Sequence, residues 1–461
     1  MFGVSMEKFI STVNSLLWGI PVLTLILILG IRLSISSGFA QIRLFPDALK
    51  RFFKSVKNIR NHGAGISGYR ALCTALAATV GTGNIAGVAG AIAIGGPGTI
   101  FWMWLCAILG MIIKMTEVTL AQRYRVRNEM GEFVGGPMYI IQSAFPKKYM
   151  LLAYIYAFFC VVAAFGVGNA TQVNTVVESI KSMAACGGFI LKWHWLLIIG
   201  VIIVLLIIRA FRYGATGVGS WAEKLVPFAS VIYIGMCFAA LFACREHLFQ
   251  AVYDIFSSAF SPKSITGGAI CSAIITLRVG ASRGVFTNEA GMGTAAIVHA
   301  SAEVDHPVEQ GLLGIMEVFL DTILICTLTA LVILSSGVHI PYGTDPGIVL
   351  TLDAFSETLG EWSRFCITGL VCIFAFATIL GWGVYGMRCA QYLFGESVWR
   401  VYIAFQAGAA ILGILLRTSV VWILSEIVNG LMAIPNLIML FILSPELFRL
   451  LDQYQKRKRT V

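Results

Sequence analysis

The chain has 461 residues, of which 58% are hydrophobic and only 12% charged, and its mean hydropathy is +0.85. This composition excludes a water-soluble globular protein and indicates a protein whose surface lies in lipid. The formal net charge is +10, but the 33 Lys and Arg residues are dispersed between apolar segments, so they predict topology signals and no nucleic-acid partner. The 11 cysteines form no CxxC pair and the histidines no HExxH pair, so we expect no metal or redox cofactor bound by these residues.

Apolar runs long enough to cross a bilayer recur along the whole chain. A hydrocarbon core about 30 Å thick requires about 20 apolar residues per helix. On this criterion we predict eleven spans, at residues 15–35, 71–95, 98–122, 150–178, 194–208, 221–243, 268–299, 309–335, 363–388, 401–416 and 418–443. The sequence therefore predicts an all-α polytopic membrane protein.

The basic residues predict how this bundle is oriented. Eleven spans place the two termini on opposite sides of the membrane. With the N-terminus outside, 23 Lys and Arg residues fall in cytoplasmic segments, 7 fall outside and 3 lie within spans. Because cytoplasmic loops carry an excess of Lys and Arg, we expect the N-terminus outside and the C-terminus in the cytoplasm. The basic tail at residues 456–459 is then a topology anchor.

Two spans carry helix-weakening residues in their middle. The second contains VGTGN at residues 80–84, and the seventh contains VGASRG at residues 279–284. Glycine, hydroxyl and amide residues weaken a helix in mid-span, and free backbone at this depth is tolerated only where protein or a water-filled cavity covers it. We predict that both helices are unwound at these points, with Gly280 and Gly284 permitting a hinge in the second.

The two predicted breaks divide the chain into repeats. When the first span is set aside, each break opens a group of five spans, and an odd number inverts the second group relative to the first. This is the inverted-repeat plan of secondary transporters, which bind substrate between paired broken helices. The predicted regions are an extra N-terminal helix with a basic segment (1–65), a first repeat (66–243), a second repeat (268–443) and a basic tail (444–461).

The first break has the chemistry to bind a zwitterion without a charged side chain. Backbone N–H groups at residues 81–84 and the positive end of the half-helix suit a carboxylate, while carbonyls at residues 77–80 suit an ammonium group or a sodium ion. No charged residue lies between Arg70 and Lys114. The alternative is that the glycines only allow close helix packing, an interpretation that we favour for Gly87 and Gly90.

Charged residues within other spans require their own explanation. Lys114 and Glu117 are three residues apart on one helix, which predicts a mutual ion pair. Glu317 and Asp321 could relay protons or pair with arginines of the seventh span, namely Arg278 and Arg283. We expect all of these carboxylates, and Glu289, to lie away from the zwitterion pocket, so that none supports a second cation site.

Several motifs together resemble the alanine or glycine:cation symporter family. The motifs are GTGNIAGVA at residues 81–89, GGPG at 95–98, FWMW at 101–104, GGPMY at 135–139, FTNEAG at 286–291 and TILGW at 378–382. The resemblance covers the chain from about residue 65 to 440. The resemblance implies a sodium-coupled symporter for alanine, glycine or serine, with the five-plus-five inverted repeat that neurotransmitter:sodium symporters share. It also implies a location in the plasma membrane of a prokaryote.

The resemblance assigns roles to individual residues. A sodium ion would be bound by the carbonyls of Ala77, Val80 and Ala375 together with the hydroxyl of Thr378. The related symporters have a second hydroxyl where this chain has Ile379. The implied substrate-binding residues are Thr82, Gly83, Asn84, Gln172, Gly280, Thr378 and Trp382.

Two of these assignments have structural alternatives. Gln172 lies in an unusually polar stretch and could serve only as an interhelical hydrogen-bonding group. Trp382 shares a helical face with Thr378 and either limits substrate size or packs against neighbouring helices.

The predicted function is thus secondary active symport of a small neutral amino acid with sodium. The alternatives are proton coupling through the intramembrane carboxylates and, with less support, an ion channel. One asymmetric pair of repeats provides no ring of equivalent groups for a channel filter. No nucleophile and base are paired in the sequence, so we expect no enzymatic activity and no cofactor beyond the coupling ion.

Overall fold

The structure is a computed structural model that describes residues 10, 12–18, 21–57, 66–212, 214–260, 264–266, 269–271, 273–415 and 418–460. In this part of the chain almost all residues are helical. The strands that the structure describes form two short antiparallel pairs, one between β1 (Val126–Arg127) and β2 (Phe133–Val134), the other between β3 (Ser264–Thr266) and β4 (Ala269–Cys271). The predicted all-α class is therefore confirmed.

The helices follow one another with short connections. In chain order, the α-helices are α2 (Pro21–Ser36), α3 (Ala40–Arg43), α4 (Phe45–Lys57), α5 (Gly68–Thr79), α6 (Ala86–Gly95), α7 (Thr99–Arg123), α8 (Pro137–Ala144), α9 (Met150–Phe165), α10 (Thr171–Cys186), α11 (Trp193–Phe211), α12 (Gly214–Ala243), α13 (Arg245–Phe260), α14 (Ala273–Asn288), α15 (Thr294–His299), α16 (Pro307–Val318), α17 (Thr327–Ser335), α18 (Val349–Leu359), α19 (Trp362–Phe394), α20 (Trp399–Leu415) and α21 (Thr418–Thr460). Short 3₁₀ turns are η1 (Thr82–Asn84), η2 (Lys147–Tyr149) and η5 (Glu396–Val398), and π-helical turns are η3 (Gly166–Ala170) and η4 (Phe319–Cys326).

The number of membrane-crossing helices agrees closely with the sequence prediction. Among the described residues, nine helices are long and apolar enough to span a bilayer, and the bent pair α5 and η1–α6 makes ten. The predicted seventh span corresponds to α14 and α15, which have 16 and 6 residues and are each too short to meet the same criterion. Ten of the eleven predicted spans thus match a helix or helix pair of membrane length.

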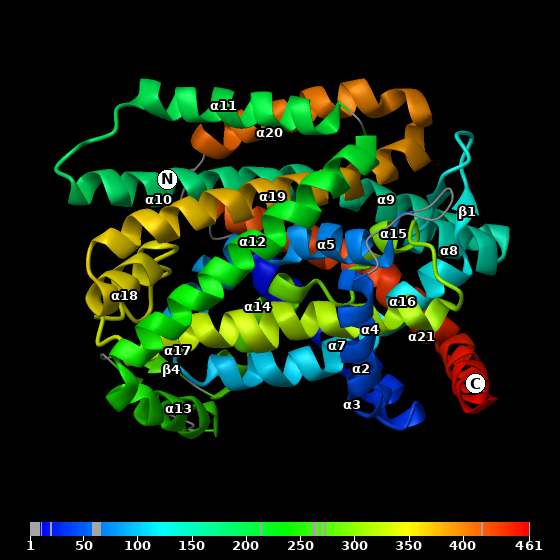
Figure 1. Cartoon of the computed structure of the whole chain (residues 1–461), viewed down its shortest axis with the longest axis horizontal. Helices are drawn as coiled ribbons and strands as arrows, with labels where there is room; N and C mark the ends of the chain where they lie inside the picture. Colours follow the sequence, from blue (N-terminus) through cyan, green and yellow to red (C-terminus); the bar gives the residue numbers. More distant parts are fainter. Residues whose placement is uncertain are drawn as a thin grey trace.

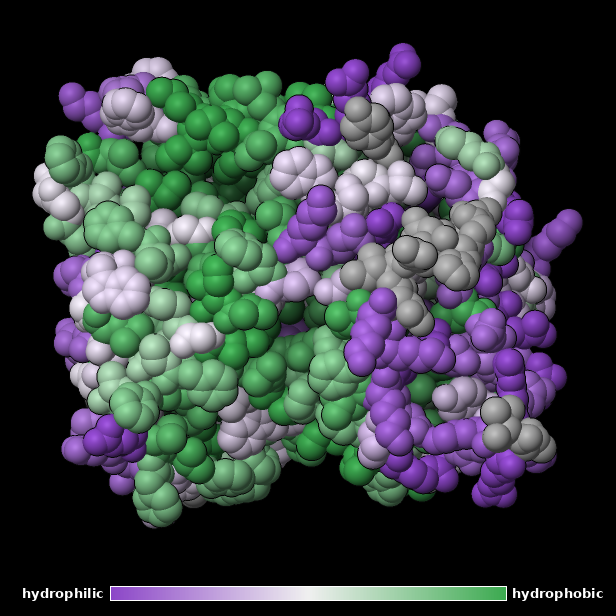
Figure 2. All heavy atoms as spheres, viewed as in Figure 1, coloured by the Kyte–Doolittle hydropathy of each residue, from purple (hydrophilic) through white to green (hydrophobic). Residues whose placement is uncertain are grey.

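The arrangement of these helices fits a membrane environment. Figure 1 shows the long helices running side by side along the horizontal direction, with α13 and α18 toward one end and α8, β1 and the C-terminal part of α21 toward the other. In Figure 2 hydrophobic side chains cover most of the left and central face, and hydrophilic ones gather on the right. Large apolar side chains such as Ile202 and Leu205 of α11 are more than half exposed. Such surface requires lipid.

The first predicted break is confirmed. Helix α5 is capped at its N-terminus by Ser67, whose hydroxyl accepts a hydrogen bond from Arg70 N, and it ends at Thr79 because Val80 is extended. The chain continues through Gly81 and the single turn η1 before α6 begins, and the two halves of the span are bent by 56°.

The second predicted break is wrong in its position. Residues 279–284 lie within α14, which is helical from Ala273 to Asn288. A Cβ at Gly280 would overlap the Thr99 carbonyl oxygen and lie 2.8 Å from Trp102 Cβ, so this glycine allows α14 to approach α7 closely. Gly280 is therefore a packing residue, and neither the hinge nor the substrate contact predicted for it is supported.

The helix actually ends some residues later, at residues 289–293. Glu289, Gly291 and Gly293 have φ angles of 54°, 94° and 75°, which place them in the left-handed region, and α15 begins at Thr294. We call residues 81–84 the first break and residues 289–293 the second break.

Packing places both broken helices in the interior of the bundle. Helix α5 packs against α12 and α19, while α14 packs against α6, α7 and the turn η1. Residues of α5, η1 and α6 from Ala71 to Ile92 are buried throughout. The division of the chain into the four regions given above stays a prediction.

Candidate functional site

At the first break the backbone leaves the helical hydrogen-bond ladder. The Gly81 N–H donates to Asn84 Oδ1 at 2.9 Å. In an uninterrupted helix this N–H would bond the carbonyl of Ala77, four residues earlier. The Ala77 carbonyl is thereby released from its helical partner, as the predicted sodium site requires. The other two predicted carbonyls belong to Val80 and Ala375, and both of these residues are buried.

The hydroxyl of Thr378 faces the first break from α19. Thr378 is 2% exposed, and its Oγ1 is a buried polar atom without a hydrogen-bond partner in the structure. A Cβ on Gly81 would overlap this same oxygen atom. Because a buried hydroxyl without a partner is unfavourable, this oxygen atom beside Gly81 is a candidate ligand atom.

The Gln172 side chain reaches the first break from α10. Its Oε1 accepts a hydrogen bond from Thr82 Oγ1 at 2.9 Å, and its Nε2 donates to the carbonyl of Val167 at 3.0 Å. Val167 belongs to the π-helical turn η3, which joins α9 to α10. Insertion of a π turn shifts the register of the following helix, and such turns often occur at functional sites. The structure thus brings Thr82, Gln172 and Thr378 together, as predicted.

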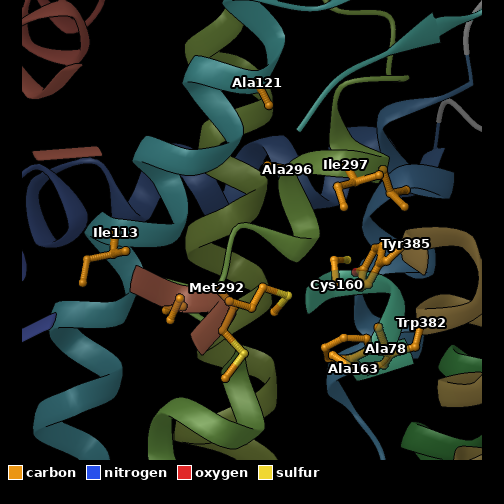
Figure 3. Close-up of a cluster of buried hydrophobic side chains, with 14 of the residues drawn as sticks. Ala78, Ile113, Ala121, Cys160, Ala163, Met292, Ala296, Ile297, Trp382 and Tyr385 are labelled. Atoms are coloured by element: carbon orange, nitrogen blue, oxygen red, sulfur yellow. The ribbon is translucent and has the colours of Figure 1, made fainter. Parts of the chain in front are cut away.

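Trp382 lies one turn beyond Thr378 and is 1% exposed. A Cβ on Gly168 of η3 would overlap Trp382 Cβ, and a Cβ on Gly381 would lie 2.8 Å from Ala78 N. Figure 3 shows Trp382 beside Ala78 and Ala163, which come from α5 and α9. The indole therefore packs tightly at the crossing of these helices. This contact supports the packing interpretation and does not test the substrate contact.

Asp321 contradicts the expectation that no carboxylate lies near the first break. Asn84 Nδ2 donates to Asp321 Oδ1 at 2.6 Å and to the Asp321 carbonyl at 3.2 Å. Asp321 Oδ2 accepts a hydrogen bond from Thr322 Oγ1 at 2.7 Å, and Asp321 is fully buried in the π-helical turn η4. Asp321 does not pair with Arg278 or Arg283, as the sequence suggested it could. Instead, it helps to hold the Asn84 side chain against the first break.

Two buried carboxylates stabilise the second break. Glu117 of α7 accepts hydrogen bonds at Oε1 from Gly291 N and Gly293 N, both at 2.9 Å, and from Asn436 Nδ2 at 2.7 Å. Asn436 Nδ2 also donates to the Gly291 carbonyl at 2.8 Å. Glu289 accepts a hydrogen bond from Thr294 Oγ1 at 2.6 Å. The N–H groups freed at the second break thus bond a carboxylate of the protein itself.

The predicted ion pair between Lys114 and Glu117 is wrong. Lys114 Nζ pairs with Glu317 Oε1 of α16 at 3.2 Å, and Glu317 Oε2 lies 3.3 Å from His299 Nε2. All of these side chains are fully buried. Helices α7 and α16 pack closely, with the Cβ position of Gly314 only 3.2 Å from the Lys114 backbone and side chain. Lys114 of α7 is therefore paired with Glu317 across the interface with α16, and not with Glu117 on its own helix.

Gly83 contacts the second repeat. A Cβ at Gly83 would lie 3.4 Å from Thr287 Cγ2 and 3.9 Å from the Phe286 ring. Phe286 in turn packs on Trp422 of α21, with ring centroids 5.4 Å apart. Neither Phe286 nor Trp422 was among the predicted site residues. Phe286 is the first residue of the FTNEAG motif, which runs into the second break, so its position in this motif could have identified it as a candidate.

The chain is similar in sequence to known cation-coupled amino-acid symporters. The sequence model of the sodium:alanine symporter family matches residues 4–461. The chain is 40% identical over 442 residues to the sodium/alanine symporter AgcS of Methanococcus maripaludis, which covers 95% of this chain and 94% of that protein. It is 33% identical over 458 residues to the probable sodium/glutamine symporter GlnT of Bacillus subtilis, covering 98% and 92%.

Solved structures resemble the fold at low sequence identity. The structure of MhsT in complex with L-phenylalanine superimposes with a TM-score of 0.58 at 14% identity, covering 85% of this chain and 99% of that one. A Na⁺-coupled sialic acid symporter superimposes with a TM-score of 0.54 at 12% identity, covering 94% and 98%. These neighbours have the inverted-repeat transporter fold, and the predicted repeat architecture is confirmed at this level.

Proposed function

Because the chain belongs to the sodium:alanine symporter family and is a cation-coupled amino-acid symporter, we propose that it takes up a small neutral amino acid, alanine or glycine, together with sodium. The observation that carries this proposal is the buried Thr378 hydroxyl, which faces the first break without a hydrogen-bond partner. Sodium prefers hard oxygen ligands, and the carbonyls of Ala77, Val80 and Ala375 would complete the set.

The substrate would bind on the other side of the first break. Its carboxylate would interact with the backbone at residues 82–84, where Asn84 and Thr82 are already positioned by Asp321 and Gln172. Trp382 would close the pocket beside Thr378 and limit it to side chains as small as those of alanine, glycine or serine. GlnT is named for glutamine, which is larger than alanine, so the uptake assay has to compare substrates of different size.

One sodium ion supplies enough energy for this transport. Moving one charge through about 100 mV is worth about 2.3 kcal/mol. A tenfold sodium gradient is worth about 1.4 kcal/mol, and the two together support roughly 500-fold accumulation of a zwitterion. Because the zwitterion carries no net charge, the proposed transport is electrogenic.

We propose further that the N-terminus faces the outside and the C-terminus the cytoplasm. In Figure 2 the hydrophilic surface gathers toward the right of the view, the side on which the basic C-terminal end of α21 lies in Figure 1. The excess of Lys and Arg in segments on this side supports its assignment as cytoplasmic.

The test is uptake of labelled alanine into proteoliposomes that contain the purified protein. An inward sodium gradient is compared with an equal potassium gradient at clamped pH, with and without an inside-negative potential. We expect accumulation only with sodium, and faster with the negative potential. Uptake in potassium that requires a proton gradient would instead assign coupling to the buried carboxylates. Competition by unlabelled glycine, serine and glutamine then ranks the substrates.

A further inference from the structure

A cavity of about 540 Å³ lies at the end of the broken span opposite to Ser67, where α5 begins. Its lining includes the start of α6 at Ala86 and Gly87, directly after the first break, and Ile94 near the end of that helix. Asn14 and Trp18 of the extra N-terminal helix form another wall. The proposed orientation puts this cavity on the outer side of the membrane, leading to the first break.

Arg283 is the central charged group of this cavity. Its Nη1 lies 3.0 Å from Glu426 Oε1 of α21, and its Nη2 lies 3.6 Å from Asp345 Oδ2, in the loop before α18. Its guanidinium also lies 5.3 Å from the ring centre of Trp422. The Arg283 side chain is 11% exposed, and the Glu426 carboxylate holds its Nη1 at ion-pair distance. The pair with Asp345 is the looser of the two, because its distance is longer and the Asp345 side chain is 42% exposed, so the guanidinium can exchange this contact for the carboxylate of a ligand.

The same face of α14 leads from the cavity to the first break. Phe286 follows Arg283 by three residues and so lies on the same side of the helix. On the side of the cavity the Phe286 ring packs on Trp422, and on the side of the first break it lies 3.9 Å from the Cβ position of Gly83. The aromatic pair Phe286–Trp422 therefore separates the charged cavity from the proposed substrate site.

The extra N-terminal helix is joined to the same acidic residue. Asn14 Nδ2 donates to Glu426 Oε2 at 2.6 Å, and the indole Nε1 of Trp18 donates to the Glu426 carbonyl at 2.8 Å. Glu426 thus keeps a hydrogen-bonded partner on the N-terminal helix when Arg283 turns away from it. This arrangement reduces the electrostatic cost of releasing the guanidinium.

We propose that this cavity is a binding station for the α-amino acid before it reaches the first break, with its carboxylate bound by Arg283 and its ammonium group bound by Asp345 or Glu426. The inference rests on the proposed amino-acid substrate. A zwitterion matches a guanidinium flanked by two carboxylates, because each of its charges finds an opposite partner. The amino acid then passes to the first break when Phe286 and Trp422 separate. Binding at the station does not require sodium, since the sodium ligands lie on the far side of this aromatic pair.

The test measures protection of an engineered thiol in the cavity. Ser282 lines the cavity beside Arg283, and Ser282→Cys is made in a background in which the exposed Cys186 and Cys366 are replaced by serine. The protein in proteoliposomes is treated from outside with a positively charged, membrane-impermeant methanethiosulfonate. We expect labelling to block uptake. Because protection scales as one plus the ratio of ligand concentration to Kd, alanine at about twice Kd should slow labelling about threefold in sodium-free medium.

Control variants separate the station from the site at the first break. Ser257→Cys on the exposed face of α13 should be labelled without loss of uptake and without protection by alanine. Arg283→Gln should abolish the protection of Ser282→Cys by alanine. Asp345→Asn should weaken this protection. Because Asp345 is a half-exposed loop residue, this second variant keeps the test possible even if Arg283→Gln does not fold.

Two outcomes would overturn the proposed station. Protection that appears only with sodium would assign alanine to the first break alone, and unchanged protection in both charge variants would remove Arg283 and Asp345 from binding. Absence of sodium-dependent alanine uptake by the unlabelled wild-type protein is a different result, which contradicts the proposed function.

Discussion

The two breaks satisfy their freed backbone groups in different ways. At the first break the Gly81 N–H bonds the neutral side chain of Asn84, which is in turn bonded to Asp321, and Gln172 bonds the Thr82 hydroxyl. Among the described residues, the Thr378 hydroxyl has no hydrogen-bond partner. At the second break the N–H groups of Gly291 and Gly293 bond the Glu117 carboxylate. The N–H groups of the second break are therefore bound by a carboxyl group of the protein itself, whereas the first break is the place at which we propose that the substrate carboxylate and the cation bind. Related repeats can thus divide binding and anchoring between them.

The largest expected effect comes from closing the first break. Gly81→Ala places a methyl group on the Thr378 oxygen, so we expect loss of sodium-dependent alanine uptake while the protein still inserts and purifies as a folded species. Gly235→Ala is the matched control, because a Cβ at this glycine of α12 meets no atom within 4 Å and the residue does not line the cavity described above. Normal uptake by Gly81→Ala would show that the contact between Gly81 and Thr378 is not part of the site.

Removing the anchor of the second break should have the next largest effect. Glu117→Gln replaces a carboxylate that accepts three hydrogen bonds, and charge-assisted bonds contribute about 1.5–3 kcal/mol each. We expect a lowered thermal unfolding midpoint in detergent and a reduced maximal uptake rate, with little change in the sodium concentration for half-maximal uptake. Glu178→Gln, which breaks a surface pair with Lys181, should leave all three quantities nearly unchanged. A large change in sodium dependence for Glu117→Gln would contradict its assignment as an anchor.

A smaller and more selective effect is expected at the sodium site. Thr378→Ala removes one proposed ligand, a loss of about 1–1.5 kcal/mol, so the sodium concentration for half-maximal uptake should rise about tenfold while alanine binding at saturating sodium changes less. Thr378→Ser should restore the wild-type value. Thr368→Ala is a matched control, because Thr368 lies on the same helix with a buried hydroxyl that also lacks a partner. Equal losses for sodium and alanine would place Thr378 in the substrate pocket only.

The sequence was informative where a feature depends on local chemistry. The first break was predictable because Gly81, Gly83 and Asn84 stand together in a span without charges, and these residue types weaken a helix at membrane depth. The span positions were predictable for the same reason, since length and hydropathy decide them.

Features that depend on tertiary contacts were not predictable from the residues alone. Gly280 and Gly291 are both glycines in one predicted span, but the first fits against the Thr99 carbonyl and only the second adopts a positive φ. Nothing local distinguishes these two uses. Lys114 and Glu117 are three residues apart, which favours a local pair, yet α16 brings Glu317 to Lys114 and the second break brings its N–H groups to Glu117. Such contacts become visible only once the helices are packed.

The smallest expected effect distinguishes the two glycines of the first break. The family resemblance assigns Gly83 to the substrate site, and the structure places its Cβ position 3.4 Å from a methyl group of Thr287, which is ordinary van der Waals contact. Gly83→Ala should therefore fold normally and change the alanine concentration for half-maximal uptake by less than about threefold, which corresponds to well under 1 kcal/mol. A bulkier residue, as in Gly83→Val, would press on Thr287 and Phe286 and should abolish binding. If Gly83→Ala abolished uptake as completely as Gly81→Ala, the substrate would have to fill the space between Gly83 Cα and Thr287, and the carboxylate would lie nearer to the second repeat than Thr82 and Gln172 indicate.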